Sequence, residues 1–211
     1  TSTLNSVACT ATSNVITVTV NAVSATISSD ETICSGGDPA AFTASTTSTN
    51  GATLSYVWES NSGSGWSVIA NEITATYDAP AGLTTTTQYR RLTTSLLNGL
   101  TCSNTSNVIT VSVNAISTSI SSDQTICSGG DPAVFTASTT STNGAALSYV
   151  WEKNSGSGWS AISGATSATY DAPSGLTTTT QYRRITSSLL NTVSCSDTSN
   201  TITITVNDVT A

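Results

Sequence analysis

A fixed distance of 93 residues separates matching residues along most of this chain. Cys34, for example, recurs as Cys127, and most of the residues around these two cysteines match without a gap. Self-similarity at a fixed period indicates repeated structural units, and this period is long enough for one small domain. The sequence therefore predicts the last strands of one unit at residues 1–23, followed by complete units at residues 24–116 and 117–211.

Each unit consists of short stretches in which apolar and hydroxyl residues alternate. Alternation with a period of two predicts β-strands, and Gly, Pro, Asn and Asp between the stretches predict turns. A unit of this length suits an immunoglobulin-like β-sandwich, which has seven strands in about 100 residues. In the first unit we expect strands at residues 25–29, 40–46, 54–60, 66–69 and 73–77, a sixth at 87–97, and a seventh that ends in 107–113.

The two complete units follow each other without a flexible linker. Val113 and Ile116 lie at the junction, and no run of Gly, Ser or Pro separates the last strand of one unit from the next strand. Flexible linkers are rich in Gly and Ser, so we expect little hinge motion here. The predicted fold class is all-β: tandem immunoglobulin-like β-sandwich repeats of about 93 residues that form an elongated rod.

Charge and composition disfavour several classes of partner. The formal net charge is −7 and only 8% of the residues are charged, whereas nucleic-acid binding needs a basic surface. The same acidity argues against anionic membrane surfaces, and no apolar run approaches the ~18 residues of a membrane span. Because the chain begins with Thr1 and shows no signal peptide, we expect it to be part of a longer protein.

Catalytic and metal sites are not expected. The chain contains no histidine, which excludes Ser-His-Asp and Cys-His catalysis and zinc sites that use histidine. Its cysteines do not form Cys-x-x-Cys pairs, and the carboxylates that recur in both units fall mostly in loops. Calcium at the loop of Asp38 is a disfavoured alternative, because calcium needs several converging carboxylates and Asp38 stands alone. We therefore predict a non-enzyme without metal or cofactor.

Tryptophans and arginines recur in both units and are candidate ligand contacts. Glu59 and Arg90 lie on strands that are neighbours in an immunoglobulin-like sandwich, so a cross-strand ion pair is expected. Trp66 follows a Gly-rich turn, and an arginine could stack on its ring. We favour a structural role for this group. The alternative is that partly exposed side chains contact a glycan, and the candidate residues are Trp66, Trp159, Arg90 and Arg183.

The five cysteines fall into two sets, and they suggest an oxidising, extracellular setting. Cys34 and Cys127 precede the second strand, whereas Cys9, Cys102 and Cys195 follow the hairpin between the sixth and seventh strands. Pairing within a unit would join opposite poles about 20 Å apart, too far for a disulfide. In a head-to-tail rod, Cys34 meets Cys195, so we favour this bond between units. Cys9, Cys102 and Cys127 would then have partners on further units. Pairing within units, Cys34 to Cys102 and Cys127 to Cys195, remains the alternative.

Several motifs resemble a known class of repeats. They are Thr-Ile-Cys-Ser-Gly at 32–36, Tyr-Val-Trp at 56–58, Thr-Thr-Thr-Thr-Gln-Tyr at 84–89, and Cys102 ahead of the strand at 108–113. Together they resemble the immunoglobulin-like and PKD-like repeats of giant Bacteroidetes surface proteins exported by the type IX system. Within that class the chain looks most like the SprB-type gliding adhesin of flavobacteria. The resemblance implies a long cell-surface filament that is moved along the cell body, with adhesion elsewhere in the parent chain and no catalytic residues.

These observations favour a non-enzymatic structural stalk of a repetitive bacterial cell-surface adhesin. Its expected partners are neighbouring repeats of the same chain and a surface polysaccharide, with no nucleic acid and no membrane insertion. Two alternatives stay open. The chain could be a polysaccharide-binding module, or its units could be spacer repeats of a secreted hydrolase.

Overall fold

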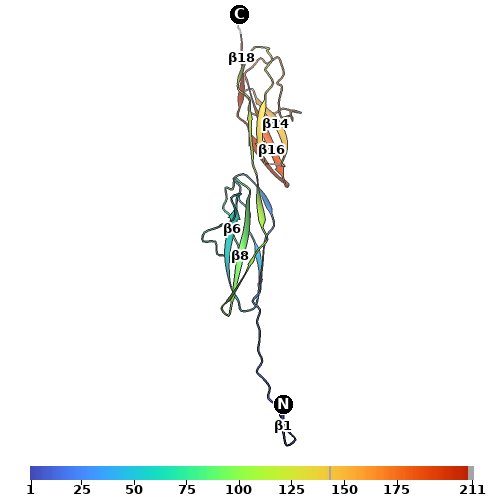
Figure 1. The fold of residues 1–211 in the computed structure, drawn as a ribbon. Coiled ribbons are helices and arrows are strands. Elements are labelled where there is room, and N and C mark those ends of the chain that lie inside the picture. Colours follow the sequence, from blue (N-terminus) through green and yellow to red (C-terminus); the bar gives the residue numbers. More distant parts are fainter. Residues whose placement is uncertain (143, 209–211) are drawn as a thin grey trace.

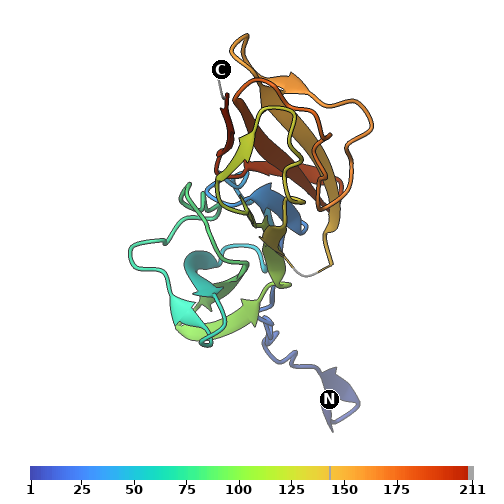
Figure 2. The same cartoon turned by 90° about the horizontal axis from the view of Figure 1, so that it is seen from above.

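Strands account for all the regular secondary structure in the computed structural model, which describes residues 1–142 and 144–208. Two β-sandwich repeats stand end to end, with the N-terminal segment extending from one end of the rod (Figure 1). Seen from above, the two repeats partly overlap and the N-terminal hairpin lies to one side (Figure 2). Within the described ranges, no segment forms a helix of the length and hydrophobicity that a bilayer crossing requires. Residues 209–211, expected in the second unit, lie outside the described residues.

Repeat 1 is built from two antiparallel layers with one parallel strand pair. The larger sheet has the strand order β4-β10-β8-β6-β7, with β9 also pairing with β8, and the smaller sheet is the pair β3-β5. The antiparallel pairing of β6 with β8 makes neighbours of the third and sixth expected strands. The strands are β3 (Val23–Ile27), β4 (Glu31–Cys34), β5 (Ala44–Ser48), β6 (Thr53–Asn61), β7 (Ser67–Val68), β8 (Thr87–Leu97), β9 (Leu100–Thr105) and β10 (Ile109–Asn114).

Repeat 2 has the same strand order in both of its sheets. Its larger sheet is β12-β18-β16-β14-β15 with β17 on β16, and its smaller sheet is β11-β13. The strands are β11 (Ile116–Ile120), β12 (Gln124–Cys127), β13 (Ala137–Ser141), β14 (Ala146–Asn154), β15 (Ser160–Ala161), β16 (Thr180–Leu190), β17 (Val193–Thr198) and β18 (Ile202–Asn207). The all-β tandem fold of immunoglobulin-like sandwiches predicted from the sequence is confirmed.

Aromatic rings fill the space between the two sheets. In repeat 1 the side chains of Phe42, Trp58, Tyr77 and Tyr89 are buried, and their ring centroids lie 4.9–6.1 Å apart in tilted pairs. Tilted aromatic pairs at such distances are favourable beyond the area they bury. Repeat 2 repeats the cluster with Phe135, Trp151, Tyr170 and Tyr182.

The strand expected at 73–77 does not form. Ile73 is exposed, and only Tyr77 of this segment pairs with the second strand, through an isolated bridge to Phe42. The carbonyl oxygen of Thr74 accepts a hydrogen bond of 3.0 Å from Trp58 Nε1, and that of Ala75 accepts one from an arginine side chain. Because buried side chains use these carbonyls, the segment does not pair along β5 as a strand.

A strand that the sequence analysis did not expect, β4, precedes the turn at Gly36. It pairs in parallel with β10, with Glu31 opposite Val111 and Cys34 opposite Asn114. The four residues of β4 are too few to show a clear alternation, and their partner lies 80 positions further along the chain. This pairing places Cys34 at the end of the sheet that faces repeat 2.

The N-terminal segment, residues 1–22, matches the last strands of a unit in sequence but does not take part in a sandwich in the structure. It forms only the hairpin of β1 (Ser2–Leu4) and β2 (Val7–Cys9), and residues 10–22 belong to no strand. Ile16 is 81% exposed, whereas Ile109, the matching residue of repeat 1, is 1% exposed. Ile109 is buried because β10 pairs with β8 in the sandwich of repeat 1.

Candidate functional site

The junction between the two repeats contains a buried polar side chain that joins one repeat to the next. Asn114 ends β10 and is 1% exposed. Its Nδ2 donates to the backbone oxygens of Ser188 (2.8 Å) and Val193 (3.0 Å), and its Oδ1 accepts from the Ser188 hydroxyl (2.7 Å). Three bonds thus fix the end of repeat 1 to the β16–β17 hairpin of repeat 2. We call this group the asparagine latch.

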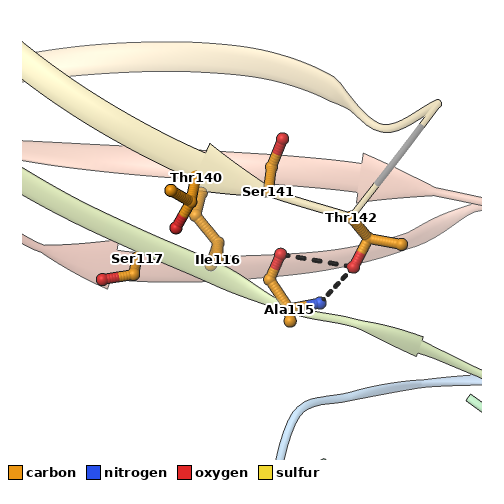
Figure 3. A pocket seen from close by; sticks show the side chains of 6 residues that line it. All are labelled: Ala115, Ile116, Ser117, Thr140, Ser141 and Thr142. Atoms are coloured by element: carbon orange, nitrogen blue, oxygen red, sulfur yellow. Dashed lines mark hydrogen bonds between the residues drawn. The ribbon is translucent and has the colours of Figure 1, made fainter. Parts of the chain in front are cut away.

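The backbone that crosses the junction is held from the other side by Thr142. The Thr142 hydroxyl donates to the carbonyl of Val113 (2.8 Å) and accepts from the amide of Ala115 (2.7 Å). Figure 3 shows the hydrogen bonds between Thr142 and Ala115 at the end of a shallow hollow, which is lined by Ala115, Ile116, Ser117, Thr140, Ser141 and Thr142. The lining side chains are small and uncharged, so the hollow offers few groups that would recognise a ligand. We interpret it as part of the junction.

A disulfide crosses the same junction. Cys34 at the end of β4 is bonded to Cys195 in β17, with their Cα atoms 5.7 Å apart and a sequence separation of 161. Beside it, Asn191 Nδ2 donates to the Thr32 hydroxyl at 3.1 Å. The structure thus joins the pair that the pole argument favoured, and it contains neither of the two bonds within a unit. Cys9, Cys102 and Cys127 are free thiols, and Cys9 and Cys127 are exposed.

The latch occurs a second time, before repeat 1. Asn21 Nδ2 donates to the backbone oxygens of Ser95 (3.1 Å) and Leu100 (2.9 Å), and its Oδ1 accepts from the Ser95 hydroxyl (2.7 Å). The third matching residue, Asn207, ends β18 and is exposed. Two filled latches with the same geometry show that the junction is a repeated element of this fold. Sequence reasoning missed it, although an Asn ends the last strand of each unit.

Asn114→Ala is expected to lower the free energy of unfolding of the two-repeat chain by about 1–3 kcal/mol. The substitution removes three hydrogen bonds, two of them donated to backbone carbonyl oxygens of repeat 2 and one of those buried. Asn207→Ala is the matched control, because Asn207 holds the same position at the end of β18 and is exposed, and the variant should stay within about 0.5 kcal/mol of the parent. Urea denaturation measures both. Equal losses in the two variants would show that the latch does not couple the repeats.

The glycan candidates of repeat 1 lie together on one face of β6, β7 and β8. Arg90 Nε is 2.6 Å from Glu59 Oε2, which is the expected cross-strand pair, and Arg90 Cζ lies 4.1 Å from the centre of the Trp66 ring. Both the ion pair and the tryptophan are partly exposed. In repeat 2 the same group is made by Glu152, Arg183 and Trp159, with distances of 2.6 and 4.3 Å. The guanidinium thus covers part of each indole that a sugar would stack on.

A second arginine, next along β8, is buried and was not recognised from the sequence. Arg91 is 0% exposed, and its guanidinium donates to the carbonyls of Ala75 and Ser45 and to the Thr46 hydroxyl, the last at 2.6 Å. Its Cζ lies 4.8 Å from the centre of the Tyr56 ring. Among the described residues no carboxylate forms an ion pair with it. Burial lowers the pKa of Arg91, because removal from water disfavours the charged form. Arg184 is its equivalent in repeat 2.

The part of the chain that the structure describes contains no group of three or more His, Cys, Asp or Glu side chains arranged to hold a metal ion. The site's chemistry is that of hydrogen bonds, one disulfide and arginine–aromatic contacts. These interactions hold protein segments together.

Comparison with known families gives one match. A family model described as "Domain of unknown function (DUF8696)" matches residues 23–115 and again residues 116–208. The chain belongs to this family. Each match begins one residue before the units that the internal repeat delimits, in agreement with the starts of β3 and β11. No curated protein matches the chain.

Among solved structures, the three N-terminal domains of the bacteriophage RB49 highly immunogenic outer capsid protein (Hoc) align with 89% of this chain and 71% of their own, at 11% identity and a TM-score of 0.50. The N-terminal four Ig domains of Dscam1 align at 18% identity and a TM-score of 0.36, over 84% of this chain and 44% of theirs. Fibronectin(III)-like modules of Clostridium thermocellum CbhA align at 14% identity and a TM-score of 0.29, over 88% and 95%. The likeness to Hoc concerns the fold alone. The chain spans less than half of the Dscam1 chain.

Proposed function

We propose that this DUF8696 array is a non-enzymatic, extracellular stalk: a rod of sandwiches that holds other parts of a bacterial surface adhesin away from the cell. The observation that carries the proposal is the junction, where an asparagine latch and the Cys34–Cys195 bond join two repeats with one residue between β10 and β11. Rigid, covalently reinforced junctions suit a part that transmits tension. The disulfide also favours an oxidising, extracellular location.

The finer proposal is that the parent protein is a gliding adhesin filament exported by the type IX system. It is supported by the sequence motifs around Cys34, Trp58 and Tyr89, which resemble the repeats of such proteins. In the structure these three residues belong to the junction and to the aromatic core. The motifs therefore reflect how the repeat is built, and they agree with a filament of many copies.

Polysaccharide binding is the second candidate function, and one observation favours it. Trp66 and Trp159 are partly exposed and recur at the same place in each repeat, next to Arg90 and Arg183. An array of equally spaced Trp–Arg groups could bind a repetitive polymer. The ion pairs with Glu59 and Glu152 argue for the stalk, because they already use the arginine side chains.

A glycan array probed with the oxidised chain separates the two functions. We expect no glycan bound above background, and no change on substituting Trp66→Ala together with Trp159→Ala. The variant Val68→Ala is a control for altered surface near β7, since Val68 is exposed and lies outside the Trp–Arg groups. If the parent and the control bind a glycan clearly and the double tryptophan variant does not, the stalk proposal is wrong and the chain is a polysaccharide-binding module.

A further inference from the structure

Two stretches of repeat 1 run side by side in the same direction along the rod. We call residues 21–34 the first path and residues 100–114 the second path. Side-chain bonds connect them at nearly the same offset along their length: Asn21 Nδ2 donates to the carbonyl of Leu100 (2.9 Å), and the amide of Ala25 donates to Asn104 Oδ1 (3.0 Å). The offset is 79 residues in both bonds, so the two paths advance together.

The contact continues to the far end of the repeat. The amide of Ile27 donates to Asn107 Oδ1 at 2.8 Å, and the amide of Thr110 donates to Asp30 Oδ1 at 2.8 Å. From there β4 and β10 pair in parallel until the paths end at Cys34 and Asn114. Repeat 2 has the same arrangement, and its bonds join Thr118 to Asp197, Ile120 to Asn200, and Thr203 to Asp123, before the parallel pairing of β12 with β18.

Each path of repeat 1 continues covalently into repeat 2. The second path passes through the peptide bonds at Ala115 into β11 and becomes the first path of repeat 2. The first path ends at Cys34, whose disulfide leads to Cys195 near the start of the second path of repeat 2. The free thiols Cys102 and Cys127 stand at the matching places, near the start of the second path of repeat 1 and at the end of the first path of repeat 2.

We propose that tension along the rod is carried by the first path of repeat 1, the disulfide and the second path of repeat 2, and that it bypasses the sandwich cores. The inference deepens the proposed stalk function and rests on it. Pulled from both ends, the chain is connected through residues 22–34, the disulfide and residues 195–207. Everything between Cys34 and Cys195, including the hairpins that bear both aromatic clusters, lies in a closed loop with a sequence separation of 161.

The lengths fit this role. A strand already spans about 3.3 Å per residue, close to the limit of about 3.6 Å for a fully extended chain. The paths are largely strands, so they can lengthen by only roughly 10–20 Å over both repeats before covalent bonds bear the load. The closed loop contains about 550 Å of extended chain that tension cannot release while the disulfide is intact. The cores therefore hold the paths in place, and their unfolding would not lengthen the stalk.

Single-molecule force spectroscopy with handles at the two termini tests the proposal. Cys9→Ser, Cys102→Ser and Cys127→Ser leave Cys34–Cys195 as the one disulfide. Once the N-terminal hairpin has opened, the oxidised chain should show no unfolding step longer than about 50 Å. With dithiothreitol, which gives two electrons and two protons to the disulfide and becomes its own cyclic disulfide, two steps of roughly 300 Å should appear, one for each repeat. Steps of that size in the oxidised chain would overturn the proposal.

Insertions show which segments bear the load. About six Gly and Ser residues inserted between Ser28 and Ser29, within the first path, should increase the maximum end-to-end extension of the oxidised chain by about 20 Å. The same insertion between Asn50 and Gly51, in the turn after β5, is the matched control and should add nothing until the disulfide is reduced. Equal gains from both insertions in the oxidised chain would exclude the bypass. Failure of the stalk function is a separate outcome, since glycan binding through Trp66 would leave these lengths unchanged.

Discussion

Arg91→Met is expected to lower the free energy of unfolding of repeat 1 by about 2–4 kcal/mol, although it removes a buried charge. Methionine can fill much of the space, but it leaves the carbonyls of Ala75 and Ser45 and the hydroxyl of Thr46 without their donor. Each buried acceptor left unsatisfied costs about 1–3 kcal/mol. The guanidinium also connects the segment before Tyr77 to β5 by hydrogen bonds, so this segment should become more mobile when the guanidinium is removed.

Arg90→Met is the matched control, one position along the same strand. Its ion pair with Glu59 is partly exposed, and such pairs contribute up to about 1 kcal/mol. Differential scanning calorimetry, with unchanged repeat 2 as an internal reference, measures both variants. Equal or higher stability of Arg91→Met would mean that desolvation of the cation costs more than its hydrogen bonds return. Arg91→Lys adds a second check, because it keeps the charge and loses the planar fork.

The sequence predicted those parts of the fold that depend on local alternation. The stretch at 87–97 forms β8 with the expected bounds, and Glu59 lies opposite Arg90 as expected for neighbouring strands. Other segments deviate, among them the strand expected at 40–46, which forms only at Ala44–Ser48, and for two of them long-range contacts give the reason. Residues 73–77 do not form a strand, because the side chains of Trp58 and Arg91 donate hydrogen bonds to backbone carbonyls of this segment. The strand β4 forms through its parallel pairing with β10.

The part of the candidate site that follows from the order of the strands could be predicted from the sequence. The position of Cys34 at one pole and of Cys195 at the other followed from the order of strands, and the structure brings these two residues together. The latch did not follow, because an Asn at the end of a strand is as typical of a turn as of a buried hydrogen bond. Arg91 lies two residues after Tyr89 on β8, so both side chains point to the buried face of the sheet. This alternation was not used in the sequence analysis to decide which of the two neighbouring arginines is buried.

Trp58→Ala is expected to cost repeat 1 about 3–5 kcal/mol, the largest effect of any single substitution proposed for this chain. The indole is fully buried, with its ring centre 5.5 Å from Tyr77 and 6.1 Å from Phe42. Its removal leaves a cavity between the sheets and takes the hydrogen-bond donor from the carbonyl of Thr74. A loss of this size is a large part of the 5–15 kcal/mol that stabilises a typical domain. Repeat 1 should therefore melt well below repeat 2.

Trp66→Ala, which truncates the same residue type eight positions further along the chain, should cost less than about 1 kcal/mol, because Trp66 is partly exposed and stacks on Arg90 at the surface. If Trp58→Ala prevents repeat 1 from folding, Trp58→Phe keeps the ring and should show a smaller loss that calorimetry can resolve. Similar losses for the two alanine variants would contradict the assignment of Trp58 to the core and of Trp66 to the surface.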